Sequence, residues 1–346
     1  MMEQLHSGAS RYIETGIGKH DASMFEKYSS ARNLNLIILP TEQCNFRCVY
    51  CYEDFLNAKK MDKTIVEGIE NLIIARNGRG LDSISLAWFG GEPLMAYDNI
   101  LQIMSCVNNV CNSTRTAISS NMTTNGYLLS LDVLSTLTKA GVTEYQISLD
   151  GDQEYHDGMR KRADGKGTFD RIWGNLIEAH KSDLQFKTTI RMHANMENAE
   201  SIESLLRRAH IEVGSDERFS VFIRPLSRLG GGNDSELPVL DKAREERLAS
   251  ESTVAKLKST TSELGLKLSQ SNLSGYVCYA SKLDALMIRR DGRIGKCTVA
   301  LYDGKNTIGK LLNDGSVEID KDKALWWARG LFSGDSAQLA CPLHAK

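Results

Sequence analysis

The stretch LNLIILPTEQCNFRCVYCY, residues 34–52, joins an apolar run to three closely spaced cysteines. The run at 34–40 is rich in aliphatic residues, which predicts a buried strand. Cys44, Cys48 and Cys51 follow it in the spacing CxxxCxxC. Enzymes built on parallel barrels carry their chemistry on the loops that follow such strands, so this segment predicts both the fold and the place of the site.

Apolar segments and helical patterns alternate from residue 34 to residue 232. Strands that alternate with helices of this length predict a parallel sheet in an α/β fold. Six such units are too few for a closed eight-fold barrel, so we expect a partial (β/α)6 TIM-like barrel. The predicted strands are 34–40, 84–90, 118–126, 144–151, 187–193 and 219–226, and the helical patterns between them include 63–76, 130–141, 169–182 and 198–210.

Changes in composition mark the end of this barrel. The polar stretch GGGNDSELP at 230–238 predicts a domain exit, and the charged segment 240–268 predicts a helical linker. Three cysteines and two hairpin signals, RRDGRIGKC and NDGSVEI, then predict a small metal-stapled domain. The expected organisation is an N-terminal segment 1–33, the barrel 34–232, the linker 233–270 and the small domain 271–346.

The overall composition is that of an ordinary globular protein. Its 346 residues carry a net charge of −2, which gives no electrostatic case for binding nucleic acid or an anionic membrane. No apolar run is long enough to span a membrane, and the first residues lack the layout of a secretory signal, so we expect a cytoplasmic protein. In that reducing compartment the eight cysteines are expected to bind metal or do catalysis instead of forming disulfides.

The first three cysteines have a spacing that suits a metal cluster. Soft thiolate ligands favour iron–sulfur clusters or zinc. Three thiolates around one four-iron cubane leave one iron open, and an open iron can chelate the amino and carboxylate groups of a substrate. The alternative is a zinc-binding loop whose fourth ligand the spacing does not reveal.

Further motifs follow these cysteines in order along the chain. WFGGEP (88–93) ends the second predicted strand, TNG (124–126) ends the third and ISLDG (147–151) ends the fourth. Together with the cysteine loop, in which the aromatic Tyr50 precedes the last cysteine, these motifs resemble the radical S-adenosylmethionine (SAM) superfamily. The resemblance implies a [4Fe–4S] cluster, held by Cys44, Cys48 and Cys51, that reductively cleaves SAM to start radical chemistry.

The motifs after the fourth strand resemble one branch of that superfamily. His156, Asp157 and Arg160, with GTFD at 167–170, are similar to the branch that carries a C-terminal SPASM or twitch domain. From the residues alone, we expect His156 and Asp157 to order their loop rather than to catalyse.

The resemblance also implies roles for polar residues at the strand ends. Gly90 and Gly91 would present backbone groups to the amino end of SAM, and Glu92 would accept a hydrogen bond from its ammonium. Arg160 would bind the SAM carboxylate, and Ser148 would contact the ribose. The remaining cofactor-binding candidates are Tyr50, Pro93, Thr124, Asn125 and Arg191. Asn195, which like Arg191 lies at the end of the fifth predicted strand, is a further candidate.

Each of these residues also has a plainer interpretation. GGEP can be a tight turn with Glu92 on the surface, and Arg160 can be a solvated charge. Ser148 and the pair 124–125 can simply shape turns at strand ends. Tyr50 can pack in the core instead of on the adenine.

A second set of cysteines lies in the last quarter of the chain. Cys278 and Cys297 enclose Gly292 in the pattern C-x13-G-x4-C, which resembles the opening of a SPASM or twitch domain. The expected closing CxxC is absent, and Cys341 is followed instead by His344. We therefore expect at most one auxiliary cluster, with three thiolates and a fourth position that is open or filled by His344 near the fraying end. The alternatives are a degenerate domain or a zinc site.

The other distinctive residues are expected to be structural. Cys106 and Cys111 fall in a helical stretch, but a separation of five does not put both on one face, so we expect buried, inert thiols. Trp326 and Trp327 are expected to pack the small domain.

The resemblance implies an enzyme that abstracts hydrogen from a ribosomal peptide or protein, leading to cross-linking, epimerisation or side-chain oxidation. The expected partners are a precursor peptide and an electron donor such as flavodoxin or ferredoxin. The segment before the first strand looks too short for a leader-recognition domain, so a separate protein can supply that recognition. The alternatives are a dehydrogenase or epimerase of a small metabolite and a non-enzymatic metal-binding regulator.

Overall fold

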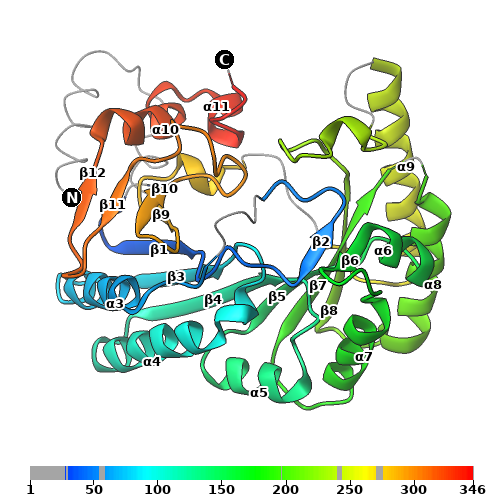
Figure 1. The fold of residues 1–346 in the computed structure, drawn as a ribbon, viewed down its shortest axis with the longest axis horizontal. Helices are drawn as coiled ribbons and strands as arrows, with labels where there is room; N and C mark the ends of the chain where they lie inside the picture. Colours follow the sequence, from blue (N-terminus) through cyan, green and yellow to red (C-terminus); the bar gives the residue numbers. More distant parts are fainter. Residues whose placement is uncertain are drawn as a thin grey trace.

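The computed structural model describes residue 28 and the ranges 30–53, 59–195, 197–239, 244–269 and 276–345. Side chains are described over the same ranges, except at 244–250. Most of the expected N-terminal segment 1–33 therefore lies outside the described residues. The predicted fold class is confirmed: the chain forms an α/β structure around a large, open parallel sheet (Figure 1).

All six predicted barrel strands are present, and they pair in parallel in the order β1-β3-β4-β5-β7-β8. Along β7 the burial alternates strictly, because even-numbered residues face the covering helices and odd-numbered residues face the barrel interior. The sheet is a partial barrel and not a closed one. The strands are β1 (Asn33–Ile38), β3 (Ser83–Trp88), β4 (Ala117–Thr124), β5 (Glu144–Ser148), β7 (Lys187–Ala194) and β8 (Phe219–Pro225).

Helices cover the outer face of this sheet. Each follows one strand, and the longer ones bury an apolar stripe against the sheet, as in α7, where Phe169, Ile172, Trp173 and Leu176 face the core. This crossover pattern sends every strand the same way and leaves the strand ends at one mouth. The covering helices are α3 (Lys63–Asn77), α4 (Tyr97–Thr114), α5 (Leu131–Lys139), α6 (Gln153–Met159), α7 (Phe169–His180) and α8 (Ala199–Val213), with a short 3-10 turn η1 (Pro93–Ala96).

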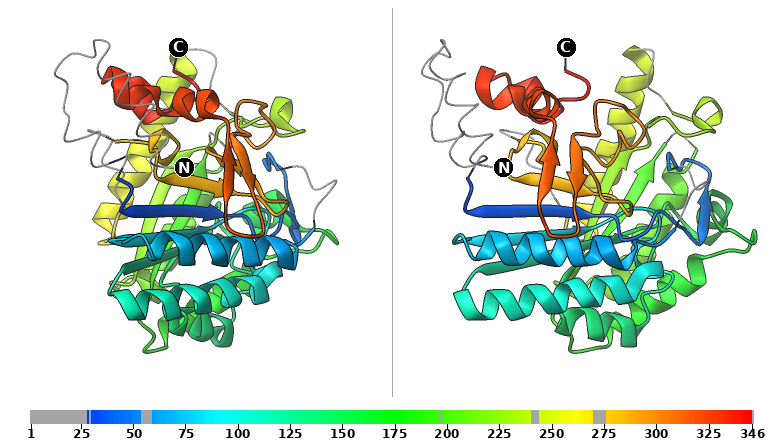
Figure 2. Two further views of the ribbon diagram at one scale, coloured as in Figure 1. Left: turned by 90° about the vertical axis from the view of Figure 1, so that its left-hand side faces the viewer. Right: turned by 60° about the vertical axis from the view of Figure 1, so that its left-hand side comes forward.

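The C-terminal elements extend the same sheet. β9 pairs in parallel with β1, so that Leu286 lies beside Leu36, and the next three strands continue outward as antiparallel hairpins. Both predicted hairpins form, with Gly292 and Gly315 in the turns at positive φ. Figure 2 shows these elements standing beside β1. They are η3 (Tyr279–Ser281), β9 (Ala285–Ile288), β10 (Arg293–Gly295), β11 (Gly309–Leu311), β12 (Val317–Ile319), α10 (Lys321–Ser333) and α11 (Ser336–Ala340).

The charged segment after the barrel forms the predicted helix, α9 (Arg244–Glu263), preceded by the short turn η2 (Asp234–Glu236). α9 packs against α8 and β8 and buries Val254 and Leu257. Val221 of β8 then exchanges backbone hydrogen bonds with Lys267 and Ser269. This segment is therefore a packed part of the barrel wall as well as a connection.

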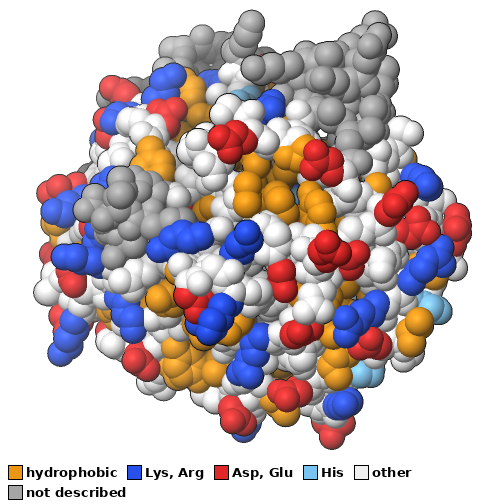
Figure 3. All heavy atoms as spheres, turned by 45° about the vertical axis from the view of Figure 1, so that its right-hand side comes forward, with side chains coloured by type: hydrophobic (Ala, Val, Ile, Leu, Met, Phe, Trp, Pro, Cys, Tyr) orange, Lys and Arg blue, Asp and Glu red, His pale blue; other side chains and the backbone are white. Residues whose placement is uncertain are grey.

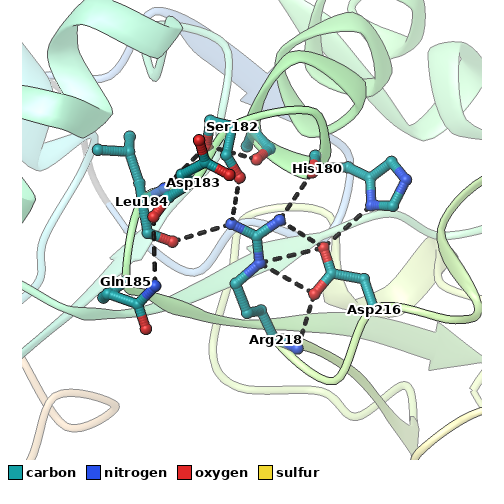
Figure 4. A network of polar contacts seen from close by, with 8 residues as sticks. His180, Ser182, Asp183, Leu184, Gln185, Asp216 and Arg218 are labelled. Atoms are coloured by element: carbon teal, nitrogen blue, oxygen red, sulfur yellow. Dashed lines mark hydrogen bonds and ion pairs between the residues drawn. The ribbon is translucent and has the colours of Figure 1, made fainter.

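A network of polar contacts closes the base of the barrel (Figure 4). Arg218, just before β8, binds the carboxylate of Asp216 and donates to the backbone carbonyls of His180, Ser182 and Leu184. His180 Nδ1 lies 2.9 Å from Asp216 Oδ2. These contacts fix the connection between α7 and β7 against the start of β8, at the end of the barrel where stability rather than chemistry resides.

Charges of both signs alternate on the face of the molecule drawn in Figure 3, around an area of hydrophobic side chains. This distribution agrees with the small net charge of the chain. In the described part of the chain, none of the helices has the length and apolarity needed to cross a membrane.

Candidate active site

The first cysteine loop is fastened to the barrel mouth by a small antiparallel ladder. β2 (Phe46–Cys48) pairs with β6 (Arg160–Arg162), and the register sets Cys48 opposite Arg160. Burial is the main cause that raises the pKa of Cys44, and it raises the pKa of Cys51 to about 12. Each of these two thiols also interacts electrostatically with Cys48, so the three form one site. Iron binding would offset the cost of deprotonating these buried thiols.

The GGEP turn lies directly against the cysteine loop. Gly91 has φ of +39°, and a Cβ there would stand 2.1 Å from the carbonyl oxygen of Gln43. Glu92 N donates to that same carbonyl at 2.7 Å. The backbone N–H of Gly91 donates at 2.7 Å to Glu53, a carboxyl group whose pKa burial raises to about 7. A glycine is therefore required at position 91 because two loops approach each other closely there. The sequence alone did not predict this requirement.

Glu92 is fully buried and ties together the ends of β3 and β4. Its Oε1 accepts from Thr124 Oγ1 at 2.7 Å and from Leu94 N at 3.1 Å, and its Oε2 accepts from Asn125 N at 2.7 Å. The surface interpretation of Glu92 is therefore wrong. A carboxylate has about four acceptor positions. Three are used, so the predicted contact with the SAM ammonium would use the remaining position on Oε2.

Four side chains form a buried polar network beside the loop. Asp150 Oδ1 accepts from His193 N at 3.0 Å and pairs with His193 Nδ1 at 2.9 Å, while its Oδ2 accepts from the hydroxyl of Tyr50. Arg160 donates to the same hydroxyl and lies 4.0 Å from Asp150. Burial alone would raise the pKa of Asp150, but His193 and Arg160 hold that pKa below its usual range. Arg160 is buried, so its interpretation as a solvated charge is wrong.

Two buried donors at this mouth lack partners. Nε of Arg160 and Nε of Arg191 are both buried and form no hydrogen bond. Ser148 is in register with Arg191, at the end of β5. Buried donors without acceptors are costly, and for Nε of Arg160 the carboxylate of SAM is an acceptor of the required kind. The residues present at the mouth therefore fit SAM.

The remaining strand-end residues are occupied by contacts within the protein. Asn125 donates to Asn45 Oδ1 at 2.7 Å, and Tyr50 packs its ring 5.1 Å from that of His193. Pro93 begins η1, and Asn195 donates to Tyr155 and accepts from two backbone N–H groups. These contacts fix the geometry of the barrel mouth. The cofactor roles of Tyr50, Pro93, Thr124 and Asn125 stay predictions.

His156 and Asp157 order their loop, as their residue types indicate. Asp157 accepts from the backbone N–H groups of Thr168 and Phe169 at 2.7 and 2.9 Å, at the start of α7. His156 contacts the hydroxyl of Thr168 at 3.0 Å. The GTFD motif thus fastens α7 to the segment that supplies Arg160.

The second set of cysteines is also gathered by the fold. Cys278 precedes η3, Cys297 follows β10 and Cys341 follows α11, yet Cys278 interacts electrostatically with both of the others. Burial raises the pKa of Cys278 and of Cys297. The hydroxyl of Tyr276 is hydrogen-bonded to Cys278. His344 is exposed and shows no polar contact with a described side chain, and its place at the fourth iron position stays a prediction.

The other predicted structural residues lie on helices. Cys111 is buried on α4, and Cys106 on the same helix is partly buried. Trp327 is fully buried in α10 and its ring lies 5.2 Å from that of Trp326. Both tryptophans pack the C-terminal elements, as their sequence context indicates.

Neither set of thiols has the geometry of a single-ion site. Within the described ranges, no three His, Cys, Asp or Glu side chains stand close enough to hold one metal ion. In a four-iron cubane each thiolate binds a different iron, so its ligands stand farther apart than those of one ion. We therefore assign the thiols of each set to one site because they interact electrostatically with one another.

Four polar residues of this region were missed by sequence reasoning. Asp150 lies inside a motif that the sequence already singled out, and its place after a strand was the available signal. Glu53, His193 and Arg224 carried no local signal, because only the fold brings Glu53 to Gly91 and His193 to Asp150 and sets Arg224 beside His193.

Comparison with known proteins identifies the class. Residues 38–209 match the Radical SAM superfamily, and that match contains the cysteine loop, the GGEP turn and the network around Asp150. The chain is a member of the radical SAM superfamily, so its cofactors include a [4Fe–4S] cluster and SAM.

Two proteins are similar to this chain in sequence, one of them uncharacterized and the other a named enzyme. An uncharacterized protein of Methanocaldococcus jannaschii is 24% identical over 297 residues, covering 84% of this chain and 93% of the relative. A GTP 3′,8-cyclase of Rhodopseudomonas palustris is 28% identical over 225 residues. That match covers 64% of this chain and 61% of the cyclase, so less than two thirds of the cyclase is represented.

Two solved structures share the fold. The enzyme anSMEcpe with bound AdoMet has a TM-score of 0.63 at 16% identity, covering 85% of this chain and 80% of its own. Streptococcus suis SuiB bound to its precursor peptide SuiA has a TM-score of 0.54 at 18% identity, covering 95% of this chain and 70% of its own.

Proposed function

We propose that this radical SAM enzyme abstracts hydrogen from a peptide or protein substrate and that its C-terminal thiols hold one auxiliary [4Fe–4S] cluster. The outcome for the peptide would be a cross-link, an epimerised residue or an oxidised side chain. Fold likeness to SuiB, which was solved with a precursor peptide, supports the peptide class.

One cavity carries this proposal. It encloses about 380 Å³ and lies between the inner face of β1, β3 and β4 and the C-terminal elements. Phe89 and Thr123, which line it, directly precede the GGEP turn and the TNG motif, while Tyr279 and Thr298 directly follow Cys278 and Cys297. The cavity is thus lined by sequence neighbours of the GGEP turn, of the TNG motif and of two C-terminal cysteines, and its size suits a side chain of a bound peptide.

The residues around the cofactor would bind, orient and exclude water. Cys44, Cys48 and Cys51 would hold the cluster, which, with SAM bound, supplies a carbon radical after reductive cleavage. Nε of Arg160 would donate to the SAM carboxylate, and Glu92 would accept from the ammonium. Burial of both residues keeps these contacts dry and therefore strong.

The auxiliary cluster would also stabilise the C-terminal elements. Cys278, Cys297 and Cys341 are far apart in the sequence, so one cluster would join η3, β10 and the end of α11. Since His344 is exposed, we expect the fourth iron position to stay open to substrate or water. Partners of the reaction would be a flavodoxin or ferredoxin as electron donor and, for a leader-bearing precursor, a separate recognition protein.

A small-metabolite substrate is the second candidate. The GTP 3′,8-cyclase relatives favour it, since those proteins act on a nucleotide. The cavity is polar as well as apolar, with Asn35, Asn121 and Lys282 in its wall, and this lining accommodates either class.

The test uses the reconstituted enzyme with SAM, dithionite and short peptides encoded beside its gene. A peptide substrate should increase 5′-deoxyadenosine formation, and a peptide deuterated at the reacting residue should pass its label to that product. Transfer of label from a nucleotide or sugar, with none from any peptide, would contradict the proposal and support the second candidate.

A further inference from the structure

Two arginines lie on neighbouring strands inside the barrel. Arg191 belongs to β7 and Arg224 to β8. In its strand, each lies between buried residues that face the helices, so each is on the interior face of the barrel. The register sets His193 beside Arg224. On the same face, the hydroxyls of Thr189 and Ser220 lie 3.0 Å apart, so side chains of these two strands meet across the interior.

Neither guanidinium has an anionic partner within the described ranges. The side chains of Arg191 and Arg224 form no ion pair or hydrogen bond with a described residue, and Nε of Arg191 is buried. Burial, followed by the charge of Arg224, lowers the pKa of Arg191 to about 10. Both groups nevertheless stay protonated at neutral pH. Two partly buried like charges are costly unless an anion binds between them.

The groups that interact with Arg191 do not supply this anion. Tyr50 and Tyr52 are phenols, which are neutral at neutral pH. Asp150 is ionised, but its Oδ1 pairs with His193 and its Oδ2 accepts from Tyr50, and it forms no hydrogen bond or ion pair with Arg191. Among the described residues around Arg191 and Arg224, the interior face therefore carries an excess of positive charge.

The pair stands between the two thiol sites. Arg191 is in register with Ser148 on the cofactor side. Arg224 interacts electrostatically with Tyr276, whose hydroxyl is hydrogen-bonded to Cys278. Arg160 is the proposed donor to the SAM carboxylate, so a further anion at this position would come from the substrate.

We infer that Arg191 and Arg224 bind a carboxylate of the substrate and that the enzyme selects a peptide with an acidic group next to the reacting residue. This inference rests on the proposed peptide function. The acidic group is an Asp or Glu side chain or a free C-terminus, since guanidinium groups match a carboxylate with paired donors.

The experiment measures protection of the two arginines in the reconstituted, SAM-bound protein. Phenylglyoxal modifies accessible guanidinium groups, and mass spectrometry reports the rate at each position. The probes are the capped peptides Ac-Gly-Glu-Gly-NH2 and Ac-Gly-Gln-Gly-NH2, the uncapped acid Ac-Gly-Gln-Gly-OH, and inorganic phosphate. The glutamate peptide should slow modification of Arg191 and Arg224 at concentrations roughly tenfold lower than the glutamine peptide.

Comparing the two acidic probes separates the sources of the carboxylate. Stronger protection by Ac-Gly-Glu-Gly-NH2 assigns the pair to a side chain, and stronger protection by Ac-Gly-Gln-Gly-OH assigns it to a C-terminus. Both outcomes support the inference.

Variants show whether both arginines are needed. Arg191→Gln and Arg224→Gln should each remove the preference for the acidic peptide at the remaining arginine, and Arg224→Lys should restore part of it. Arg207→Gln, on the exposed side of α8, changes the charge equally and should keep the full preference. Circular dichroism and iron content verify that each variant is folded.

Three results would overturn the inference. These are equal or absent protection by the glutamate and glutamine peptides, stronger protection by phosphate than by any carboxylate, and complete protection by SAM alone. Each can occur while peptide-dependent 5′-deoxyadenosine formation persists, so failure here is distinct from failure of the peptide function.

Discussion

Arg289 and Glu42 form a buried, two-pronged ion pair, with Nε to Oε1 at 2.8 Å and Nη2 to Oε2 at 2.9 Å. Arg289 follows β9, and Glu42 lies two residues before Cys44. Arg289 also donates to the carbonyl of Leu301 at 2.8 Å. The C-terminal elements thus hold the loop that carries the first cysteines.

Breaking this pair should destabilise the protein and loosen the cysteine loop. Arg289→Met removes both hydrogen bonds to buried Glu42 and leaves it only the longer pair with Arg290 at 3.9 Å, which should cost about 3–5 kcal/mol in urea unfolding and lower the iron content of the first site. The double variant Glu42→Gln, Arg289→Met removes the stranded charge and should recover part of the loss. If the single and double variants lose equal stability, the two residues do not act as a pair.

Replacing Cys44, Cys48 and Cys51 by Ala should abolish the conversion of SAM to 5′-deoxyadenosine and methionine, because the open iron is lost. The assay is anaerobic, with dithionite and chromatographic detection. A Cys106→Ala variant serves as the matched control and should remain active. Full activity in the triple variant would refute the central assignment.

Glu92→Gln and Arg160→Ala should weaken SAM binding, since each removes a charge-assisted contact worth about 1.5–3 kcal/mol. Isothermal titration of reconstituted protein measures the affinity. Each residue also holds the mouth in place, so iron content must match that of the wild type before affinities are compared. Unchanged affinity in both variants would assign them to the internal network alone.

The Cys278, Cys297, Cys341→Ala variant should lose about four irons and keep SAM cleavage. Iron determination and Mössbauer spectra measure the loss. His344→Ala should leave the spectra unchanged, because the imidazole is exposed. No loss of iron, or zinc in its place, would show that the auxiliary cluster does not exist.

The network at the barrel base predicts a pH dependence of stability. Burial alone would raise the pKa of Asp216, but hydrogen bonds from Arg218 and His180 lower it to about 2. Because the unfolded carboxyl has a pKa of about 3.9, the stabilisation is complete above that pH and is lost as the pH falls towards 2.

Arg218→Met should therefore cost about 2–3 kcal/mol at neutral pH and flatten the acid side of the stability profile. Urea unfolding from pH 2 to 7 measures both. Arg207→Met, in an exposed pair on α8, should change little. A parallel shift of the whole profile, with its slope preserved, would contradict the role given to Asp216.

The repeating units of the barrel were predictable because their signal is local. Strands such as β7 alternate buried and inward-facing residues, and helices such as α7 repeat apolar residues at helical spacing. The three-residue strands β2 and β6 were missed, since so short a segment has no period. The pairing of β9 with β1 was missed as well, because a buried run such as ALMI does not indicate which distant strand lies beside it.

The candidate site was predictable where a sequence motif by itself indicates the chemistry of its residues. The cysteines and the glycines of GGEP fall into that class. Glu53 as the partner of Gly91, and the unpaired arginines 191 and 224, depend on which loops and strands the fold brings together. Spacing along one chain does not carry that information.

The position of β9 has a consequence for synthesis of the chain. β1 forms one edge of the six-stranded barrel, and its partner on that side emerges from the ribosome only after most of the chain has been made. Until then the backbone groups of β1 on that side are unpaired, a surface that favours association between nascent chains. The cysteine loop that follows β1 also lacks Arg289 during this interval. The barrel is therefore completed late, after β9 has been translated. The loop that would hold the first cluster is fixed in place only then.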